Sequence, residues 1–286
     1  MSYILETRDL TQVYGAGTPF ERTALDHVNI QVKKGEILGV IGHTGSGKST
    51  LIQHFNGLLK PTSGEVLLSG HSIWDAKGKC DRKTRFAVGL VFQYPEYQLF
   101  EETIAKDIAF GPQNMGLSAT EVEKRVREAM DFVGLDPVLA NHSPFALSGG
   151  QKRRVAIAGV IAMRPQVLIL DEPTAGLDPA GRDEILAQIQ DYHARSGATI
   201  LIVSHSMEDI ARMADRLLVM NRAHVMLCGT PREVFAHADE IVEAGLDIPE
   251  ITKVIRELNR RGIDLDPSIY TVEDAVRAIR AYKEGK

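Results

Sequence analysis

Residues 42–49 read Gly42-His43-Thr44-Gly45-Ser46-Gly47-Lys48-Ser49 and fit the pattern G-x-x-x-x-G-K-[ST]. The apolar run 37–41 before them is typical of a buried strand, and residues 50–55 after them have a helical pattern. Glycines at these positions let backbone N–H groups converge on a polyphosphate, and the start of a helix adds partial positive charge. This context favours a phosphate-binding loop over a glycine-rich turn that matches by chance.

The polar side chains of this loop indicate its ligand. Lys48 can neutralise the β- and γ-phosphates of a nucleotide, and the Ser49 hydroxyl can ligate Mg²⁺. Thr50 follows directly and belongs to the same predicted binding segment. We therefore expect a nucleotide polyphosphate with Mg²⁺ at residues 42–50.

Two adjacent carboxylates end a second buried-strand pattern. The apolar residues 167–170 are followed by Asp171 and Glu172, which places both acids at the carboxyl edge of a central strand, where open α/β sheets bind ligands. Asp171 would hold Mg²⁺ through its water shell, and Glu172 could polarise an attacking water. The alternative is a strand that simply ends in solvated acids.

The order of the patterns predicts an α/β fold. Apolar runs at 37–41, 167–170 and 199–203 alternate with helical stretches, which is typical of a parallel sheet covered on both faces. Shorter β-rich runs lie at 3–7, 28–32 and 65–68, and residues 118–139 have a helical period. From about Pro231 the chain has the pattern of amphipathic helices, the last beginning near Thr271 with Val272, Ala275, Val276 and Ile279 on one face.

Composition limits the class of protein. The 286 residues are 44% hydrophobic and 25% charged, with a net charge of −5 and a mean hydropathy of −0.10, which favours one large globular domain with a small addition. No run approaches the length of a membrane span, and no secretory signal is visible. Cys80 and Cys228 lack the spacing of a metal site, so we expect neither a zinc site nor a disulfide framework. The compartment we expect is a reducing cytosol. The acidic balance favours no nucleic-acid partner.

A second glycine-rich segment precedes a helical pattern. Leu147-Ser148-Gly149-Gly150-Gln151 is followed by three basic residues and the apolar-rich stretch 155–163. The start of this helix is a second anion-binding terminus in a chain with only one phosphate-loop lysine. The alternative is an ordinary helix cap.

Together the two glycine-rich motifs resemble those of ATP-binding-cassette (ABC) ATPases, over about residues 1–231. The resemblance implies a P-loop NTPase fold with a RecA-like core, an antiparallel β-subdomain and a helical subdomain at about 95–160. It implies a Mg²⁺-dependent ATPase in which residues 148–151 close over ATP held by the phosphate loop of an opposing subunit. Residues 232–286 are similar to a C-terminal helical dimer-contact segment.

The resemblance also assigns single residues. Gln93 matches the glutamine that contacts Mg²⁺ and the attacking water, Asp178 matches the aspartate that lies across the dimer, and His205 matches the histidine at the γ-phosphate. Glu172 would then be the general base. Tyr14 matches the aromatic residue that stacks on adenine. Segment 15–22 is longer than in the shortest family members, and Phe20 within it competes for that role.

Three stretches, residues 14–21, 92–100 and 148–158, resemble the ATPase subunits of energy-coupling-factor (ECF) importers, and the first two are closer to the second of the paired ATPase types. The resemblance implies a transport ATPase at the cytoplasmic face of the membrane that powers uptake of a vitamin or transition metal. Its partners would be a second ABC ATPase, a membrane coupling subunit and a membrane substrate-binding subunit.

Several alternatives stay open from the sequence. The chain could serve a conventional binding-protein-dependent importer or act as a soluble nucleotide switch. The aromatic and acidic segment 94–103 fits a groove for a helix of the membrane partner, or an ordinary surface loop. The apolar stripe of the tail fits a dimer contact, or a cap on the chain's own core. Neither the substrate nor the choice between a homodimer and a heterodimer can be read from the residues.

Overall fold

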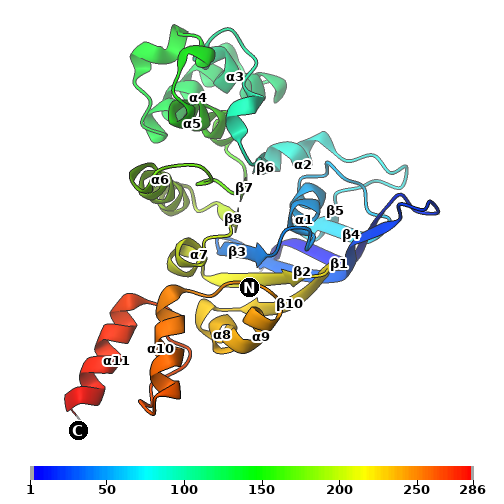
Figure 1. The fold of residues 1–286 in the computed structure, drawn as a ribbon. Coiled ribbons are helices and arrows are strands. Elements are labelled where there is room, and N and C mark those ends of the chain that lie inside the picture. Colours follow the sequence, from blue (N-terminus) through cyan, green and yellow to red (C-terminus); the bar gives the residue numbers. More distant parts are fainter. Residues whose placement is uncertain (1–2, 285–286) are drawn as a thin grey trace.

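The structure is a computed structural model that describes residues 3–284, and it contains two β-sheets flanked by helices (Figure 1). The larger sheet has the strand order β10-β9-β3-β8-β7-β6, in which only the β9–β10 pair is antiparallel. Its strands are β3 (Ile37–Gly42), β6 (Val88–Val91), β7 (Val167–Asp171), β8 (Thr199–Val203), β9 (Arg216–Asn221) and β10 (His224–Gly229). The predicted parallel sheet is confirmed.

The smaller sheet is antiparallel and has the order β2-β1-β4-β5. Its strands are β1 (Tyr3–Tyr14), β2 (Arg22–Lys33), β4 (Ser63–Leu68) and β5 (His71–Ser72). β1 and β2 have 12 residues each and extend well beyond the runs 3–7 and 28–32 expected from the sequence. The sequence did not reveal this length, because polar residues within both strands interrupt the alternation of apolar and polar positions. The pairing of β1 with β2 contains several register shifts, which explains the interruptions.

Helices cover both faces of the parallel sheet. In chain order, the α-helices of the described residues are α1 (Lys48–Phe55), α2 (Arg82–Ala87), α3 (Ile104–Asn114), α4 (Ala119–Phe132), α5 (Gly149–Ile161), α6 (Pro179–Ser196), α7 (Met207–Met213), α8 (Pro231–Ala236), α9 (Ala238–Glu243), α10 (Glu250–Arg260) and α11 (Val272–Glu284). Alternate residues of β7 explain the layers. Leu168 and Leu170 pack with α6, whereas Val167 and Ile169 pack in the core that α1 shares with the antiparallel sheet.

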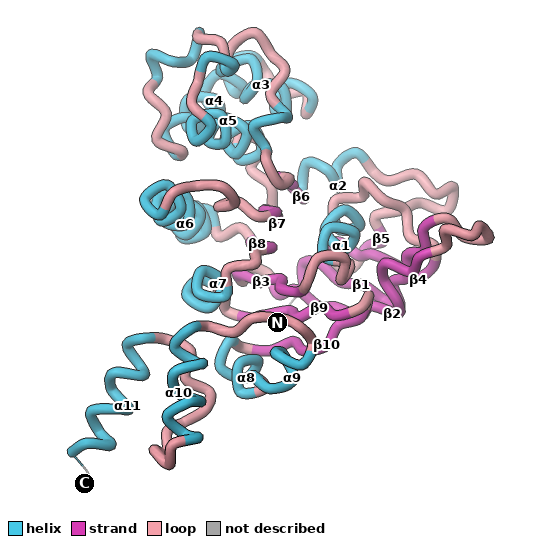
Figure 2. Tube along the Cα trace, in the orientation of Figure 1, coloured by secondary structure: helices cyan, strands magenta, loops and turns pink. Residues whose placement is uncertain are grey.

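α3, α4 and α5 form a helical subdomain that lies to one side of the sheets (Figures 1 and 2). The expected helix over 118–139 is shorter than predicted, because α4 ends at Phe132. Gly134 then takes a left-handed φ of 65°, and a 3-10 helix occupies Pro137–Asn141. The glycine and the proline that follow explain why the helical period does not continue as one helix.

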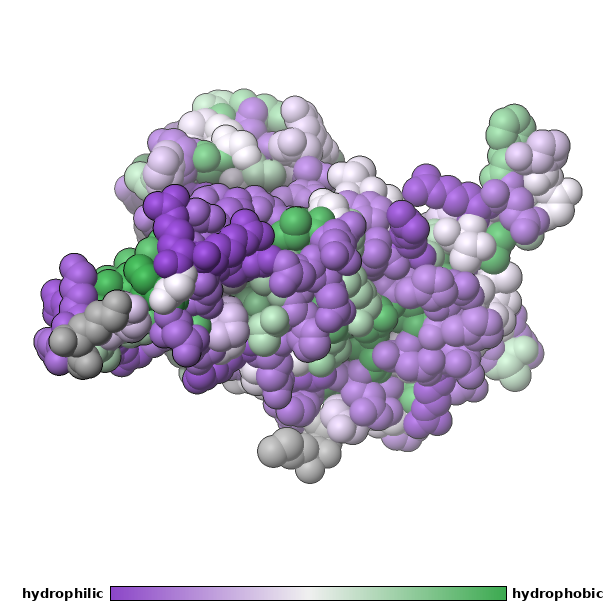
Figure 3. Space-filling view, turned by 60° about the horizontal axis from the view of Figure 1, so that its bottom comes forward, coloured by the Kyte–Doolittle hydropathy of each residue, from purple (hydrophilic) through white to green (hydrophobic). Residues whose placement is uncertain are grey.

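The C-terminal helices divide into two parts. α8 and α9 pack through Val234, Phe235 and Ile241 against the parallel sheet, so this part of the tail does cap the chain's own core. α10 and α11 form a separate small cluster around Ile255 and Ala275. The expected apolar face of α11 is only partly covered, because Val272 and Val276 are 60% and 41% exposed. Hydrophobic residues also show among hydrophilic ones over these helices, at the left of Figure 3.

Within residues 3–284, no helix combines the length and the apolar character that crossing a bilayer requires. Both cysteines are free thiols.

Candidate functional site

The candidate site lies where four neighbouring parallel strands end. The order β3-β8-β7-β6 brings together the loop after β3, His205 after β8, the two acids at the end of β7 and Gln93 after β6. They border a pocket of about 440 Å³. Its lining is Tyr14, Arg22, Ala24, Thr44, Gly45, Gly47, Lys48, Ser49, Thr50, Gln93, Asp171, Glu172, Val203 and His205.

The loop after β3 wraps around the ammonium group of Lys48. The Lys48 Nζ donates to the carbonyl oxygens of Gly42 at 2.6 Å and His43 at 3.1 Å. Gly47 precedes α1 with a φ of 107°, and a Cβ there would lie 2.4 Å from a backbone oxygen of β2. Only glycine fits this position. The backbone conformation of Gly47 directs the N-terminus of α1 toward the pocket.

Three residues of the motif support the loop rather than line the pocket. Ser46 is fully buried, and Gly42 packs closely against the backbone of β9. The ring of His43 spans from the Thr44 carbonyl oxygen at 2.8 Å to the Asn221 Oδ1 at 3.1 Å. The loop is therefore held from behind by the end of β9.

Glu172 is aimed at the pocket by an unusual backbone conformation. Its φ is 50°, in the left-handed region that costs a non-glycine residue free energy and that is found at functional sites. The Glu172 Oε2 accepts from the His205 backbone N–H at 3.4 Å, and the His205 Nε2 lies 3.3 Å from Glu172 Oε1. Oε1 is buried and has no hydrogen-bond partner among the described residues. The carboxylate thus presents an unused acceptor next to Lys48 and His205.

Burial controls the ionisation of this cluster. Burial raises the pKa of Glu172 to about 7, against the backbone hydrogen bond from His205. Burial also raises the pKa of Asp171, while the nearby charge of Lys48 lowers it. The pKa of Lys48 is lowered by burial, although both acids oppose this, and the pKa of His205 is lowered by burial and by Lys48. Glu172 can therefore change its protonation state near neutral pH.

This raised pKa predicts that Glu172→Gln stabilises the folded protein at alkaline pH. The folded state holds the Glu172 proton more tightly than the unfolded chain, so stability falls as pH rises from the ordinary value of 4.5 through about 7. Above that range we expect a penalty on the order of 2 kcal/mol, which glutamine does not have. Urea unfolding of the nucleotide-free chain at about pH 5 and about pH 8 measures it. An equal difference between variant and wild type at both pH values would contradict the prediction, and Glu243→Gln on α9 is the control.

The site fits Mg²⁺ together with a nucleotide. The protein donors in reach are the Ser49 hydroxyl, the Gln93 amide oxygen and the Asp171 carboxylate, all oxygen atoms that suit this ion, and Ser49 hydrogen bonds to Asp171. Residues 3–284 contain no cluster of three or more His, Cys, Asp or Glu side chains that would hold a metal ion alone. Phosphate oxygens would have to complete the coordination.

The mouth of the pocket is formed by the facing ends of β1 and β2. Tyr14 and Arg22 are direct partners in that pairing, and the Tyr14 hydroxyl lies 3.4 Å from Thr50 Oγ1. Tyr14 is among the lining residues, whereas Phe20 is 87% exposed and is not. Sequence reasoning missed Arg22, whose Nη2 is 3.4 Å from the Gly45 carbonyl oxygen. Its place in the pocket depends on the pairing of β1 with β2, which the local pattern of residues does not reveal.

The second glycine-rich motif lies outside this pocket. Ser148 caps α5, with its Oγ accepting from the Gln151 N–H at 3.3 Å and Gln151 Oε1 accepting from the Ser148 N–H at 3.1 Å. A Cβ at Gly149 or Gly150 would meet no atom within 4 Å. Asp178 is exposed and caps α6 by accepting from the Gly181 N–H at 2.7 Å. Within one chain, these residues do not share the pocket of Lys48.

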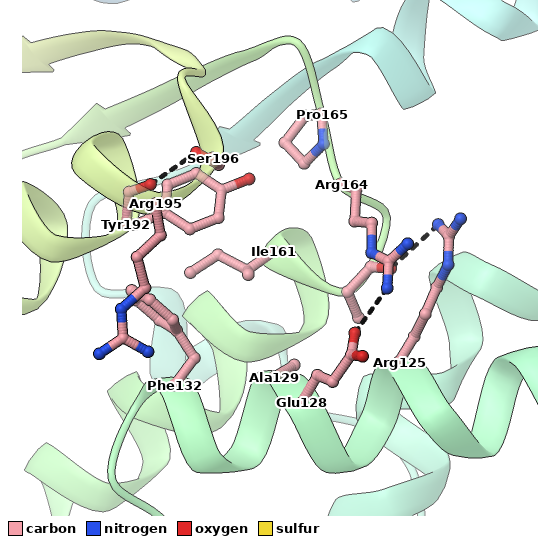
Figure 4. A pocket seen from close by; sticks show the side chains of 11 residues that line it. Arg125, Glu128, Ala129, Phe132, Ile161, Arg164, Pro165, Tyr192, Arg195 and Ser196 are labelled. Atoms are coloured by element: carbon pink, nitrogen blue, oxygen red, sulfur yellow. Dashed lines mark hydrogen bonds and ion pairs between the residues drawn. The ribbon is translucent and has the colours of Figure 1, made fainter.

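Another pocket, of about 420 Å³, lies between α4, the end of α5 and the end of α6 (Figure 4). Its arginines are already engaged: Arg164 donates to Glu128 at 2.6 Å, and Arg125 donates to the carbonyl oxygens of Ala162 and Met163. None of the sequence-predicted site residues lines it. This ion pair and these two hydrogen bonds tie α4 to the segment that follows α5.

Comparison with known proteins places this geometry in a family. The sequence profile described as "ABC transporter" matches residues 25–175. The energy-coupling factor transporter ATP-binding protein EcfA2 of Caldanaerobacter subterraneus is 54% identical over 98% of this chain and 98% of its own length. The chain belongs to the ABC transporter ATPases, in the energy-coupling factor group. The EcfA2 of Clostridium tetani is also 54% identical, over 96% of both chains.

Solved structures agree with this ABC ATPase fold. The cbiO1 protein of Clostridium perfringens, described as part of the ABC transporter complex cbiONQ, is 41% identical and matches with a TM-score of 0.74 over 91% of this chain and 96% of its own. The dimeric ATP-binding cassette MJ0796, with ADP and Pi bound, is 28% identical with a TM-score of 0.70 over 79% of this chain and 98% of its own. The predicted ABC fold, the ECF group and the second ATPase type are confirmed.

Proposed function

We propose that this chain binds and hydrolyses ATP as one half of an ATPase pair that powers an ECF-type importer of a vitamin or transition metal. It would lie at the cytoplasmic face of the membrane as a peripheral subunit. Its partners would be a second ABC ATPase, a membrane coupling subunit and a membrane substrate-binding subunit. The names of the EcfA2 relatives and the cbiONQ description of a neighbour support this proposal.

One observation carries the hydrolytic role. Glu172 Oε1 is buried, has no hydrogen-bond partner among residues 3–284 and faces the same pocket as Lys48 and His205. With a pKa of about 7, the carboxylate can accept a proton from a water molecule near neutral pH. We therefore assign Glu172 as the general base.

The remaining residues of the pocket have matching tasks. Lys48 would release its hydrogen bonds to the two loop carbonyl oxygens and bind the β- and γ-phosphates instead. Backbone N–H groups at the start of α1 would also donate to these phosphates. Ser49, Gln93 and Asp171, the last through water, would hold Mg²⁺, which when bound neutralises charge on the phosphates. His205 would donate to the γ-phosphoryl group as charge develops in the transition state, and Gln93 would orient the water.

Tyr14 would stack on adenine at the mouth of the pocket, and Tyr14→Ala tests this. Loss of the ring removes the stacking surface, so we expect the KM for ATP to rise about tenfold with little change in kcat. Phe20→Ala is the matched control, because Phe20 lies in the same hairpin but outside the pocket. Steady-state ATPase assays decide, and a larger KM effect from Phe20→Ala would reverse the assignment.

The second half of each ATP site would come from the partner ATPase. Ser148, Gly149, Gly150 and Gln151 are exposed or half-exposed at the start of α5, where N–H groups can meet a phosphate. Asp178 would cross to the partner near them. ATP held between two subunits would close the pair, and hydrolysis would open it.

A groove beside residues 94–103 suits a helix of the membrane coupling subunit. It has a volume of about 500 Å³ and lies between α2, α3 and α5. Phe100 and Phe110 stack edge to face there at 4.9 Å and are 57% and 46% exposed. This apolar exposure is typical of a surface that another protein covers. The exposed valines of α10 and α11, Val254, Val272 and Val276, similarly suit a contact with the second ATPase.

Purification of the tagged chain from detergent-solubilised membranes tests the proposal. We expect mass spectrometry to identify a second, related ATPase and two integral membrane proteins, and the complex to hydrolyse ATP. Recovery without any integral membrane protein would favour the soluble switch. Recovery with an extracytoplasmic binding protein instead of a membrane substrate-binding subunit would favour the conventional importer.

A further inference from the structure

A buried arginine on α5 connects to the loop that carries Glu172. The side chain of Arg153 is 3% exposed, and its Nη1 donates to the carbonyl oxygens of Pro173 at 3.1 Å and Ala175 at 2.8 Å. The Ala175 N–H in turn donates to the Glu172 carbonyl oxygen at 3.1 Å. Arg153 therefore holds the turn that directly follows Glu172.

The same guanidinium meets the segment that follows Gln93. Glu96 lies in the 3-10 helix Pro95–Gln98, and its Oε2 is 3.5 Å from the Arg153 Nε. Neither of these two atoms has a hydrogen-bond partner among the described residues. Tyr94, which directly precedes this 3-10 helix, has a left-handed φ of 55°. Arg153 thus stands between the Gln93 segment and the Glu172 turn.

The energetics of this contact do not favour a purely stabilising role. A buried charge needs close pairing and full hydrogen bonding to offset its lost hydration. Here the ion pair is long, and neither of the two atoms that form it has a hydrogen-bond partner among the described residues. Arg154, the next residue, contrasts with it: its side chain is 23% exposed and pairs with Glu184 on α6.

We propose that Arg153 is a positioning residue for hydrolysis. It fixes the turn at 173–175 and thereby the position of the Glu172 carboxylate. Because Arg153 also contacts Glu96, this position depends on where the segment around Glu96 lies. This segment borders the groove lined by Gln98 and Phe100. A helix seated in the groove would shift Glu96, and Arg153 would carry the shift to Glu172. This second step rests on the proposed function of the groove.

Kinetics of the purified transport complex test the proposal, with the partner ATPase's own base silenced. For Arg153→Gln we expect kcat to fall at least about tenfold, because the base is misplaced. The KM for ATP should stay within about twofold, because the pocket lining is intact. Arg153→Lys, which reaches one carbonyl, should restore part of the rate. Arg154→Gln is the matched control and should behave as wild type.

Equal effects of Arg153→Gln and Arg154→Gln, or a raised KM with unchanged kcat, would overturn the proposal. If Arg153→Gln does not fold, Glu96→Gln decides, since it leaves both carbonyl contacts in place. Reduced kcat at constant KM then supports the role, and wild-type kinetics contradict it. Glu172→Gln in the same series separates the two hypotheses: if that variant is inactive while Arg153→Gln is normal, only the positioning role fails.

Discussion

Glu172→Gln is expected to lower ATP turnover at this chain's site by at least about a hundredfold, because an amide cannot accept the proton of the attacking water. ATP binding should not weaken, since Lys48, Ser49 and Tyr14 are unchanged. The loss of a buried carboxylate beside the phosphates should even favour binding above about pH 7, where the wild-type group is ionised. Equilibrium binding of a fluorescent ATP analogue and phosphate release measure the two effects separately.

The conditions of this test matter because a second ATPase could mask the loss. The equivalent carboxylate of a related partner must be changed to an amide as well. Glu243→Gln, an exposed acid of α9, is the control and should leave turnover unchanged. Near-normal turnover by Glu172→Gln, with binding intact, would exclude Glu172 as the base. His205, 3.3 Å from its carboxylate, would then be the next candidate.

The pocket was predictable because its residues follow strands with strong local patterns. Glu172 and His205 come two residues after an apolar run, and Lys48 ends the glycine-rich loop that follows another. Parallel strands bring such ends to one edge of the sheet. Element ends depended on weaker signals. α4 stops at Phe132 rather than near Leu139, since Gly134 adopts a left-handed backbone that a helical period cannot reveal.

Arg22 and Arg153 show what a sequence alone does not contain. Lys152, Arg153 and Arg154 are three consecutive basic residues, and the middle one is buried only because that face of α5 packs against the Glu172 turn and the Gln93 segment. Arg22 reaches the pocket because a hairpin sets it opposite Tyr14. Both placements depend on long-range packing, and local propensity carries no information about it.

The second glycine-rich motif, at the start of α5, leads to a prediction for Gly149→Arg. A Cβ at Gly149 meets no atom within 4 Å, so the chain should fold and bind ATP normally. An arginine there would keep the N–H groups of α5 from the partner's ATP, and hydrolysis at the partner's phosphate loop should fall at least about a hundredfold. Ala119→Arg is the matched control, because Ala119 is also the first residue of a helix capped by serine.

Combining this variant with Glu172→Gln shows whether the site is shared between subunits. In a self-paired chain, each variant alone is inactive, yet a mixed dimer keeps one site with an intact base and an intact second glycine-rich motif. Random mixing should then restore about a quarter of wild-type turnover. With a related partner, each single variant silences a different site, and both changes in one chain silence both. A site built within one chain predicts no recovery on mixing, because Gly149 and Glu172 would then serve the same ATP.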